Sequence, residues 1–160
     1  MQRTPLHKTH VALGARMVDF GGWSMPLYYG SQISEHHAVR RGAGIFDVSH
    51  MAILDIRGGE ARSFLRRVLA NDVGELQDPG KALYSCMLRE DGGILDDLIV
   101  YWLGGERFRI ISNAATRAKN LSWLRGAANG IAVEIIQRKD LVILAIQGPQ
   151  ARKIVAESVS

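Results

Sequence analysis

The chain has 160 residues, of which 47% are hydrophobic and 22% charged, a composition typical of a globular domain with its own core. It contains one cysteine, which excludes an internal disulfide and a multi-cysteine metal site and favours a reducing compartment. The net charge of +4 fits an anionic ligand or an acidic protein partner. The basic residues form no run that indicates nucleic acid, and no stretch approaches the ~20 apolar residues of a membrane span.

The first half of the chain contains signals for two helices and one strand. Residues 19–30 (DFGGWSMPLYYG) are too apolar for a flexible linker and too irregular for a helix, so they predict a packed irregular segment. Residues 31–44 begin with Ser31, a favoured N-cap residue, and end in glycines, which predicts a short helix. Residues 51–58 alternate in polarity and predict a strand, whereas residues 60–70 have the apolar spacing of an amphipathic helix.

Three strands joined by short turns are predicted next. Residues 82–90 and 93–103 flank Asp91 and Gly92, the strongest short hairpin signal in the chain. Residues 107–113 add a third strand after a Gly-Gly turn. The sequence therefore predicts consecutive antiparallel strands in this region.

The last part of the chain predicts a helix, two strands and a final helix. The helix covers residues 114–128, the strands cover 131–138 and 141–148, and the final helix opens at Pro149, a favoured first-turn residue. From residue 51 onward the order is β-α-β-β-β-α-β-β-α, which indicates an α+β fold of antiparallel sheets with flanking helices. The strand over 141–148 would expose an apolar surface unless something outside this sequence covers it.

Two adjacent carboxylates, Asp96 and Asp97, interrupt the apolar strand predicted over 93–103. Because side chains alternate along a strand, the two must point to opposite faces. Both faces are otherwise apolar, so we expect the strand to be covered on both sides. Asp96 is interpreted as an anchored carboxylate that accepts backbone N–H groups or pairs with an arginine. Asp97 shares its face with Tyr101, a pair that suits a planar heterocycle with N–H donors, although a purely structural role stays open.

Six stretches, in this order and spacing, resemble the aminomethyltransferase family, the T-proteins of the glycine cleavage system. They are TPLHKTHVALGARMVDFGGWSMPLYY, EHHAVRRGAGIFDVSHM, ANDV, PGKALYS, GGILDDLIVY and NAATRAKNLSWL. The resemblance runs from residue 2 to residue 150, and the folate-dependent domains of dimethylglycine and sarcosine dehydrogenases match less closely. It implies the T-protein folate-binding fold.

The resemblance also implies a reaction. T-proteins take the aminomethyl group from the lipoyl arm of the H-protein, release ammonia and pass the methylene group to tetrahydrofolate, their co-substrate. The implied partners are lipoylated H-protein and folate, with no nucleic acid and no membrane. No metal is expected, because His36, His37 and His50 have no Cys or carboxylate at metal-ligand spacing. The expected location is the bacterial cytoplasm.

The resemblance assigns five site residues. The catalytic aspartate of the family matches the second of the pair, Asp97, and the pterin pocket matches Met51, Tyr84, Asp97, Tyr101 and Asn113. The residues alone leave other interpretations open. Met51 suits a core position, Tyr84 suits a packing position on a strand, and Asn113 suits a helix N-cap.

Members of the family are longer than this chain, so the chain is expected to be a truncated piece of the fold. Residues 1–50 are expected to form the N-terminal part of a first folate-binding subdomain. Residues 51–138 would form an α+β subdomain with mainly antiparallel strands, and residues 139–160 an incomplete return to the first subdomain. The expected function is aminomethyl transfer in glycine cleavage. The alternatives are a non-catalytic folate-binding module or scaffold of the same fold, and an inactive fragment.

Overall fold

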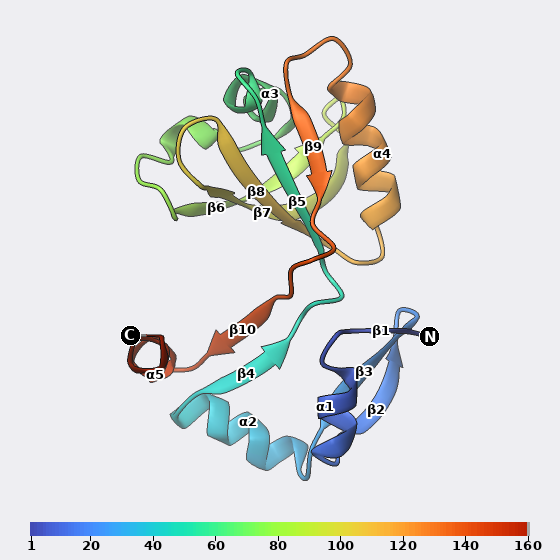
Figure 1. Cartoon of the computed structure of the whole chain (residues 1–160), viewed down its shortest axis with the longest axis vertical. Coiled ribbons are helices and arrows are strands. Elements are labelled where there is room, and N and C mark those ends of the chain that lie inside the picture. Colours follow the sequence, from blue (N-terminus) through green and yellow to red (C-terminus); the bar gives the residue numbers. More distant parts are fainter. Residues whose placement is uncertain (160) are drawn as a thin grey trace. The chain divides into compact units, whose positions relative to one another are not determined.

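A computed structural model describes residues 1–159 of the chain. It contains two compact units, which we call the central unit (Met51–Leu141) and the terminal unit (Met1–His50 with the chain from Val142 onward). In Figure 1 the chain enters the central unit after the cyan strand β4 and leaves it after the orange strand β9. The terminal unit is thus built from both ends of the sequence.

The central unit is a five-stranded antiparallel sheet with helices. The strands lie in the order β6-β7-β8-β5-β9, and every neighbouring pair is antiparallel. Its elements are β5 (Ala52–Arg57), α3 (Ala61–Val68), the 3-10 helix η1 (Val73–Glu75), β6 (Ala82–Leu88), β7 (Ile94–Trp102), β8 (Arg107–Ser112), α4 (Arg117–Ala127) and β9 (Glu134–Gln137). The α+β fold and the hairpins expected from the sequence are confirmed.

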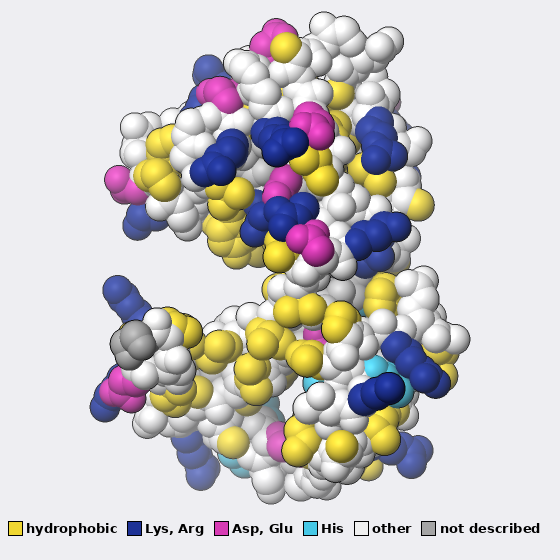
Figure 2. Space-filling view, viewed as in Figure 1, with side chains coloured by type: hydrophobic (Ala, Val, Ile, Leu, Met, Phe, Trp, Pro, Cys, Tyr) yellow, Lys and Arg dark blue, Asp and Glu magenta, His cyan; other side chains and the backbone are white. Residues whose placement is uncertain are grey.

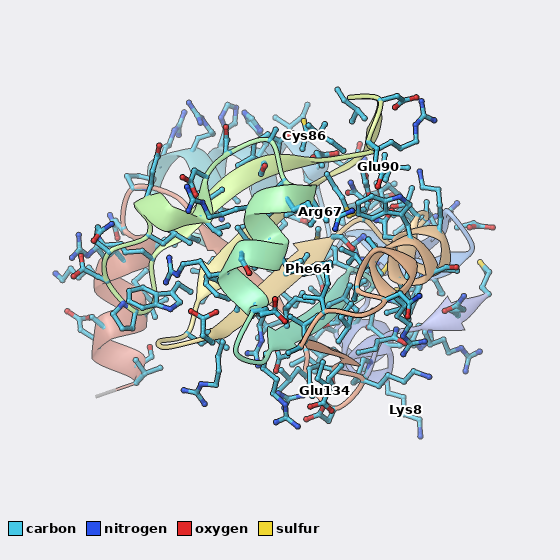
Figure 3. The ribbon with its side chains drawn as sticks, turned by 90° about the horizontal axis from the view of Figure 1, so that it is seen from above. Lys8, Phe64, Arg67, Cys86, Glu90 and Glu134 are labelled. Carbon is cyan, nitrogen blue, oxygen red and sulfur yellow. The ribbon has the colours of Figure 1, made fainter. Side chains whose placement is uncertain are left out.

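The core of the central unit lies between one face of this sheet and the two helices α3 and α4. Phe64 and Leu65 of α3 and Leu124 of α4 are buried together with side chains from four strands. Figure 3 shows Phe64 beneath the ribbon of α3, whereas Arg67 of the same helix points outward to Glu90. The amphipathic pattern of residues 60–70 therefore places its apolar stripe against the sheet.

The turn between β6 and β7 follows the hairpin signal in the sequence. Gly92 has a φ of +80°, a conformation that glycine adopts without the steric cost of a side chain. The Asp91 carboxylate accepts a hydrogen bond from the Gly93 N–H at 2.9 Å, and Arg89 N–H donates to the Gly93 carbonyl at 2.8 Å. This turn sets the register in which Cys86 lies opposite Asp97.

The N-terminal part of the terminal unit corrects one prediction from the sequence. Its N-terminal elements are β1 (Gln2–Arg3), α1 (His7–Ala12), β2 (Arg16–Phe20), β3 (Trp23–Tyr28), α2 (Gln32–Arg41) and β4 (Gly44–Asp47). The irregular segment predicted over residues 19–30 is wrong, because its residues belong to a β2–β3 hairpin. Pro26 lies within β3, but beyond the two residues of β3 that pair with β1. Its partner in β2 is next to a register shift, a place where a strand tolerates proline.

The C-terminal elements are β10 (Leu144–Gln147) and α5 (Ala151–Ser158). β10 pairs with β4 of the terminal unit and β9 pairs with β5 of the central unit, so the two strands predicted in succession join different sheets. Gln150 is the N-cap of α5, so Pro149 precedes the helix instead of lying in its first turn. Apolar side chains of this two-stranded sheet are exposed, among them Ile45 at 64% and Leu144 at 43%. Figure 2 shows hydrophobic side chains on the surface of the terminal unit.

A buried polar network joins three elements of the terminal unit. His10 of α1 has one ring nitrogen 2.7 Å from the Tyr29 hydroxyl and the other 2.9 Å from the Asp47 carboxylate. Burial acts to raise the pKa of Asp47, but hydrogen bonds led by that from Ser49 outweigh it and hold this pKa below its usual range. An ionised Asp47 therefore fixes His10 between the ends of β3 and β4.

Candidate functional site

The candidate site lies on the face of the sheet opposite the helices. β7 presents Leu98 and Val100 to the core, where they are buried, and presents Asp97 and Ile99 to the other side, where both are exposed. The expectation that β7 is covered on both sides is therefore wrong for the described residues. The reason is that α3 and α4 pack against the same face. We call the opposite side, which carries Asp97, the open face.

Asp96 lies on the core side of β7 and is held by side chains near the start of α4. It accepts hydrogen bonds from Asn113 Nδ2 at 2.9 Å and Thr116 Oγ1 at 2.5 Å, and a further one from Asn120 Nδ2. Burial acts to raise the pKa of Asp96, but these hydrogen bonds outweigh it and leave the pKa below its usual range. Asp96 is therefore an ionised carboxylate held in place by hydrogen bonds. Its side-chain donors among the described residues are one hydroxyl and two amides, and not an arginine.

Both oxygens of Asp97 accept hydrogen bonds from predicted site residues. The Tyr84 hydroxyl on β6 donates to Oδ2 at 3.1 Å, and Asn113 Nδ2 donates to Oδ1 at 3.1 Å. Asn113 follows the last residue of β8, so the strands on either side of β7 supply these two donors. The hydrogen bond to Asp97 raises the pKa of Tyr84, because removing the phenolic proton would break this bond and place a phenolate next to the Asp97 carboxylate.

An apolar row lies beside Asp97 on the open face. Tyr84 is paired with Ile99, Ile99 with Ile111 and Ile111 with Ile53, and residues directly opposite one another share a face. Tyr84 is 58% exposed and Ile99 is 37% exposed. A carboxylate with two fixed donors thus borders a row of aliphatic and aromatic side chains.

The other two predicted site residues have no hydrogen bond to Asp97 among the described contacts. Tyr101 lies on the same face four residues along β7, next to Arg109 on β8. Met51 directly precedes β5, and its carbonyl accepts a hydrogen bond from Arg117 at 3.3 Å. The structure therefore joins Asp97, Tyr84 and Asn113 by hydrogen bonds, and it places Tyr101 and Met51 in the same unit without a hydrogen bond to them among the described contacts.

Charged residues occupy the other end of the open face. Asp55 of β5 accepts two hydrogen bonds from Arg109, at 2.6 and 2.9 Å, and one from Arg138 at 2.7 Å. Arg138 also holds Asp140 through two hydrogen bonds. Burial acts to raise the pKa of Asp55, but the two arginines outweigh it and hold the pKa below its usual range. This cluster is charge-balanced and joins β5, β8 and the chain after β9.

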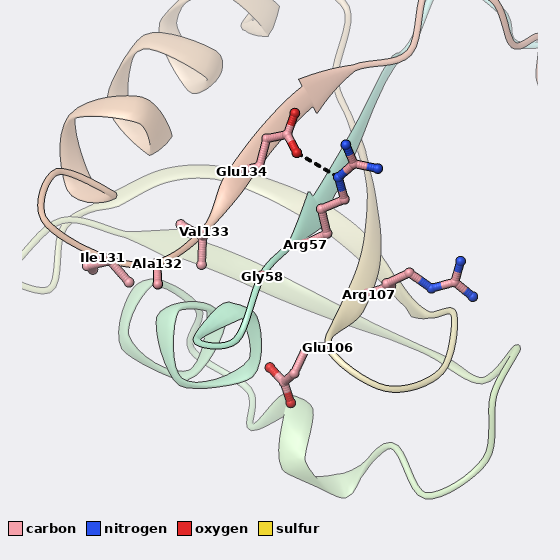
Figure 4. A pocket seen from close by; sticks show the side chains of 8 residues that line it. All are labelled: Arg57, Gly58, Glu106, Arg107, Ile131, Ala132, Val133 and Glu134. Atoms are coloured by element: carbon pink, nitrogen blue, oxygen red, sulfur yellow. Dashed lines mark hydrogen bonds and ion pairs between the residues drawn. The ribbon is translucent and has the colours of Figure 1, made fainter.

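A shallow hollow lies at the end of the sheet, between the end of β5, the start of β8 and the loop that leads into β9 (Figure 4). Arg57 and Glu134 form an exposed ion pair at its edge, with 2.7 Å between Nε and Oε2. Gly58 has a φ of +133°, and a Cβ there would lie 2.3 Å from the Ala132 carbonyl oxygen. The hollow thus depends on a close backbone approach, and it contains none of the five predicted site residues.

Sequence reasoning missed Thr116 and Asn120, which hold Asp96. Their signal was present, because a hydroxyl and an amide four residues apart lie on one face of a helix. The spacing alone does not show that this face of the helix meets Asp96. The structure shows Thr116 in the N-cap position, so the interpretation of Asn113 as the N-cap of this helix is wrong.

Three further findings concern the described part of the chain. Residues 1–159 contain no group of three or more His, Cys, Asp or Glu side chains placed to hold a metal ion. No helix within this range is both long and apolar enough to cross a membrane. Cys86 is half-buried and lies opposite Asp97 in the β6–β7 pair.

A solved structure shares this architecture. The crystal structure of glycine cleavage system aminomethyltransferase T from Bartonella henselae matches with a TM-score of 0.89 and 38% identity, over 98% of this chain and 43% of that one. A heterotetrameric sarcosine oxidase from Corynebacterium sp. U-96 matches with a TM-score of 0.53 and 17% identity, over 79% of this chain and 62% of that one, which shows a similar fold only. The chain is therefore an α+β protein of the architecture seen in an aminomethyltransferase.

The sequence comparisons define the family. The model of the GCVT N-terminal domain matches residues 6–160, so the chain belongs to the GCVT N-terminal domain family. Aminomethyltransferase from Stenotrophomonas maltophilia (strain K279a) is 62% identical over 154 residues, which are 96% of this chain and 42% of that protein. Aminomethyltransferase from Pseudomonas syringae pv. tomato is 56% identical over 159 residues, which are 99% of this chain and 44% of that protein. The chain thus spans less than half the length of these relatives.

Proposed function

We propose that this chain supplies the Asp97-bearing part of an aminomethyltransferase of the glycine cleavage system. The reaction would transfer the methylene of the aminomethyl group on lipoylated H-protein to tetrahydrofolate, with release of ammonia. The observation that carries the proposal is the Asp97 carboxylate, exposed on the open face and held at both oxygens by Tyr84 and Asn113. The identity to named aminomethyltransferases supports it. Because these relatives are bacterial, we propose the bacterial cytoplasm as its location.

The residues of the open face suit a reduced pterin. A flat heterocycle can pack on the row that contains Tyr84 and Ile99, both of which are exposed. The ring N–H groups of a pterin are donors, and an ionised carboxylate offers only acceptors. Asp97 would bind such a donor, with Tyr101, Asn113 and Met51 as the remaining proposed contacts. Tetrahydrofolate would supply the nitrogen nucleophiles that receive the methylene group.

Asp97 would act by electrostatics and orientation. When ammonia leaves, positive charge develops on the methylene carbon that remains bonded to sulfur. A carboxylate held close by stabilises that charge. The same carboxylate can orient an N–H of the attacking nitrogen and accept its proton. Since Tyr84 and Asn113 already fix its two oxygens, Asp97 needs little rearrangement when the charge develops.

The test combines binding with turnover. Calorimetric titration of the chain with tetrahydrofolate measures binding, and ammonia release from aminomethylated H-protein measures turnover. Asp97→Asn is expected to keep the fold and much of the folate binding and to lower turnover about 100-fold or more, as losses of electrostatic stabilisation do. Asp78→Asn, a change at an exposed loop position, is the matched control. Near-normal turnover in Asp97→Asn would contradict the role of Asp97.

The length of the chain supports a second candidate function. Because the chain spans 42% of the Stenotrophomonas relative, it can hold the Asp97 site and lack parts needed for turnover. It would then be a folate-binding module or an inactive fragment. Folate binding without ammonia release by the unmodified chain would favour this candidate, and release of ammonia would exclude it.

A further inference from the structure

The two aspartates of β7 are connected by one side chain. Asn113 Nδ2 lies 2.9 Å from Asp96 Oδ1, 3.1 Å from Asp97 Oδ1 and 3.3 Å from the Asp97 carbonyl oxygen. An amide nitrogen has two hydrogens, so one can serve each carboxylate. Asp96 and Asp97 point to opposite faces, yet they share this donor because Asn113 stands just past the end of the neighbouring strand β8.

The two carboxylates determine which way the Asn113 amide faces. An ionised carboxylate only accepts hydrogen bonds, so Nδ2 must point toward the pair and the carbonyl oxygen Oδ1 must point away. Asp96 is the firmer of the two partners. Thr116 and Asn120, one turn apart on α4, hold its other oxygen, and these hydrogen bonds keep its pKa low.

We propose that Asp96 is a positioning residue for Asp97, acting through the side-chain amide of Asn113. Asp96 fixes the orientation in which Asn113 donates to Asp97 Oδ1, and it thereby fixes the carboxylate plane that the substrate meets. The Asn113 carbonyl oxygen, turned away from both carboxylates, becomes an acceptor for a ligand N–H. This inference rests on the proposed function for its catalytic consequence, but the orientation of the amide can be tested without any turnover.

Anchoring alone does not account for this arrangement. Thr116 Oγ1 and Asn120 Nδ2 already satisfy one oxygen of Asp96, and a water or a backbone group could satisfy the other. The donor present is instead the amide that reaches Asp97. Without the Asp96 charge, Asp97 alone opposes a half-turn of the amide. Such a half-turn would place the amide oxygen against Asp97 Oδ1, an unfavourable meeting of two acceptors.

The first experiment records the side-chain amide of Asn113 in the 15N-labelled chain by NMR. Its signals are assigned by their loss in Asn113→Ser. In the unmodified chain both amide protons are expected to be shifted and protected from exchange, because both are hydrogen-bonded. Asp96→Asn is expected to move both signals and speed their exchange, whereas Asp78→Asn is expected to leave them unchanged. Unchanged Asn113 signals in a folded Asp96→Asn would overturn the inference.

The second experiment measures turnover and KM for tetrahydrofolate in the same variants. A positioning role predicts that kcat of Asp96→Asn falls about tenfold, equivalent to about 1.4 kcal/mol in the barrier, and that KM changes much less. A merely structural role predicts a less stable protein with normal kcat once folded. If the unmodified chain shows no turnover, the proposed function fails for this chain alone, and the NMR measurement still decides the inference.

A second pair of variants covers the case in which Asp96→Asn does not fold. Thr116→Val removes one donor to Asp96 without changing the charge, and Thr116→Ser restores the hydroxyl. The expected result is that Thr116→Val shifts the Asn113 amide signals and lowers kcat, and that Thr116→Ser recovers both. Equal behaviour of the two variants would contradict the proposal.

Discussion

The two faces of the five-stranded sheet use the same strands for different purposes. On the core face Val100, Phe108 and Ile110 are fully buried against α3 and α4. On the open face Tyr84 and Ile99 are exposed beside the Asp97 carboxylate. Because side chains alternate along each strand, one set of residues stabilises the unit and the next set is available for binding.

The adjacent aspartates show this division at the level of single residues. Asp96 is satisfied by groups from the core side and the start of α4, whereas Asp97 meets solvent with two donors fixed beside it. Two neighbouring polar residues of one strand can therefore have different roles, one structural and one functional, because their side chains point to opposite faces of the sheet. Substitutions on each face should separate the two roles.

The largest expected effect is on stability from the core face. Ile110→Ala is expected to lower the free energy of unfolding by about 2–5 kcal/mol, because it leaves a cavity in a fully buried site. Ile99→Ala, the matched change on the open face, is expected to cost about 1 kcal/mol or less. Urea unfolding followed by the fluorescence of Trp102 and Trp123, both in the central unit, measures the difference. Equal losses would mean that the open face is packed as tightly as the core.

The next effect is a pH-dependent loss at Asp96. At neutral pH, Asp96→Asn is expected to cost about 1–3 kcal/mol, because a half-buried carboxylate that accepts several hydrogen bonds is removed. The folded pKa of Asp96 is lowered, so its contribution is complete above the unfolded value of about 3.9 and is lost as the pH falls through the folded value. The difference between Asp96→Asn and the unmodified chain should therefore shrink in acid. A constant difference across this range would show that the ionised form is not the stabilising one.

A smaller effect separates the charged end of the open face from its Asp97 end. Asp55→Asn is expected to cost about 1–2 kcal/mol, because Arg109 and Arg138 lose a partly buried charged acceptor. Glu134→Gln, in the exposed pair with Arg57, is expected to cost at most about 1 kcal/mol. Both are measured by urea unfolding at low and high salt. A loss of folate binding in Asp55→Asn, with stability unchanged, would assign this cluster to the binding site instead.

Much of the central unit could be predicted from the sequence, because its signals are local. The hairpin at Asp91 and Gly92 and the amphipathic pattern of residues 60–70 depend on turn chemistry and periodicity within short windows. Alternation also separates Asp96 from Asp97 without any structure. Periodicity does not show which face of the sheet the helices cover, since that depends on how the loops place α3 and α4 against the sheet.

The remaining features depend on the register in which neighbouring strands pair. The β2–β3 hairpin is not predicted, since Pro26 disfavours a strand unless its place beside a register shift is known. The bridge from Asp96 through Asn113 to Asp97 joins residues from a strand and from the turn before α4. Neither arrangement follows from composition or spacing, since both depend on the exact register between neighbouring strands.

The smallest expected effect is a spectroscopic one at Tyr84. Its pKa is raised above the usual value of about 10, first by the hydrogen bond to Asp97 and then by desolvation and the charge of Asp97. Asp97→Asn removes that charge, so the pKa of Tyr84 should fall back toward its usual value. The ultraviolet absorbance of tyrosinate measures this, with Tyr84→Phe identifying which part of the titration belongs to Tyr84. An unchanged Tyr84 titration in Asp97→Asn would mean that the two side chains are not coupled in solution, and the Asp97 carboxylate would then have Asn113 as its only donor among the described residues.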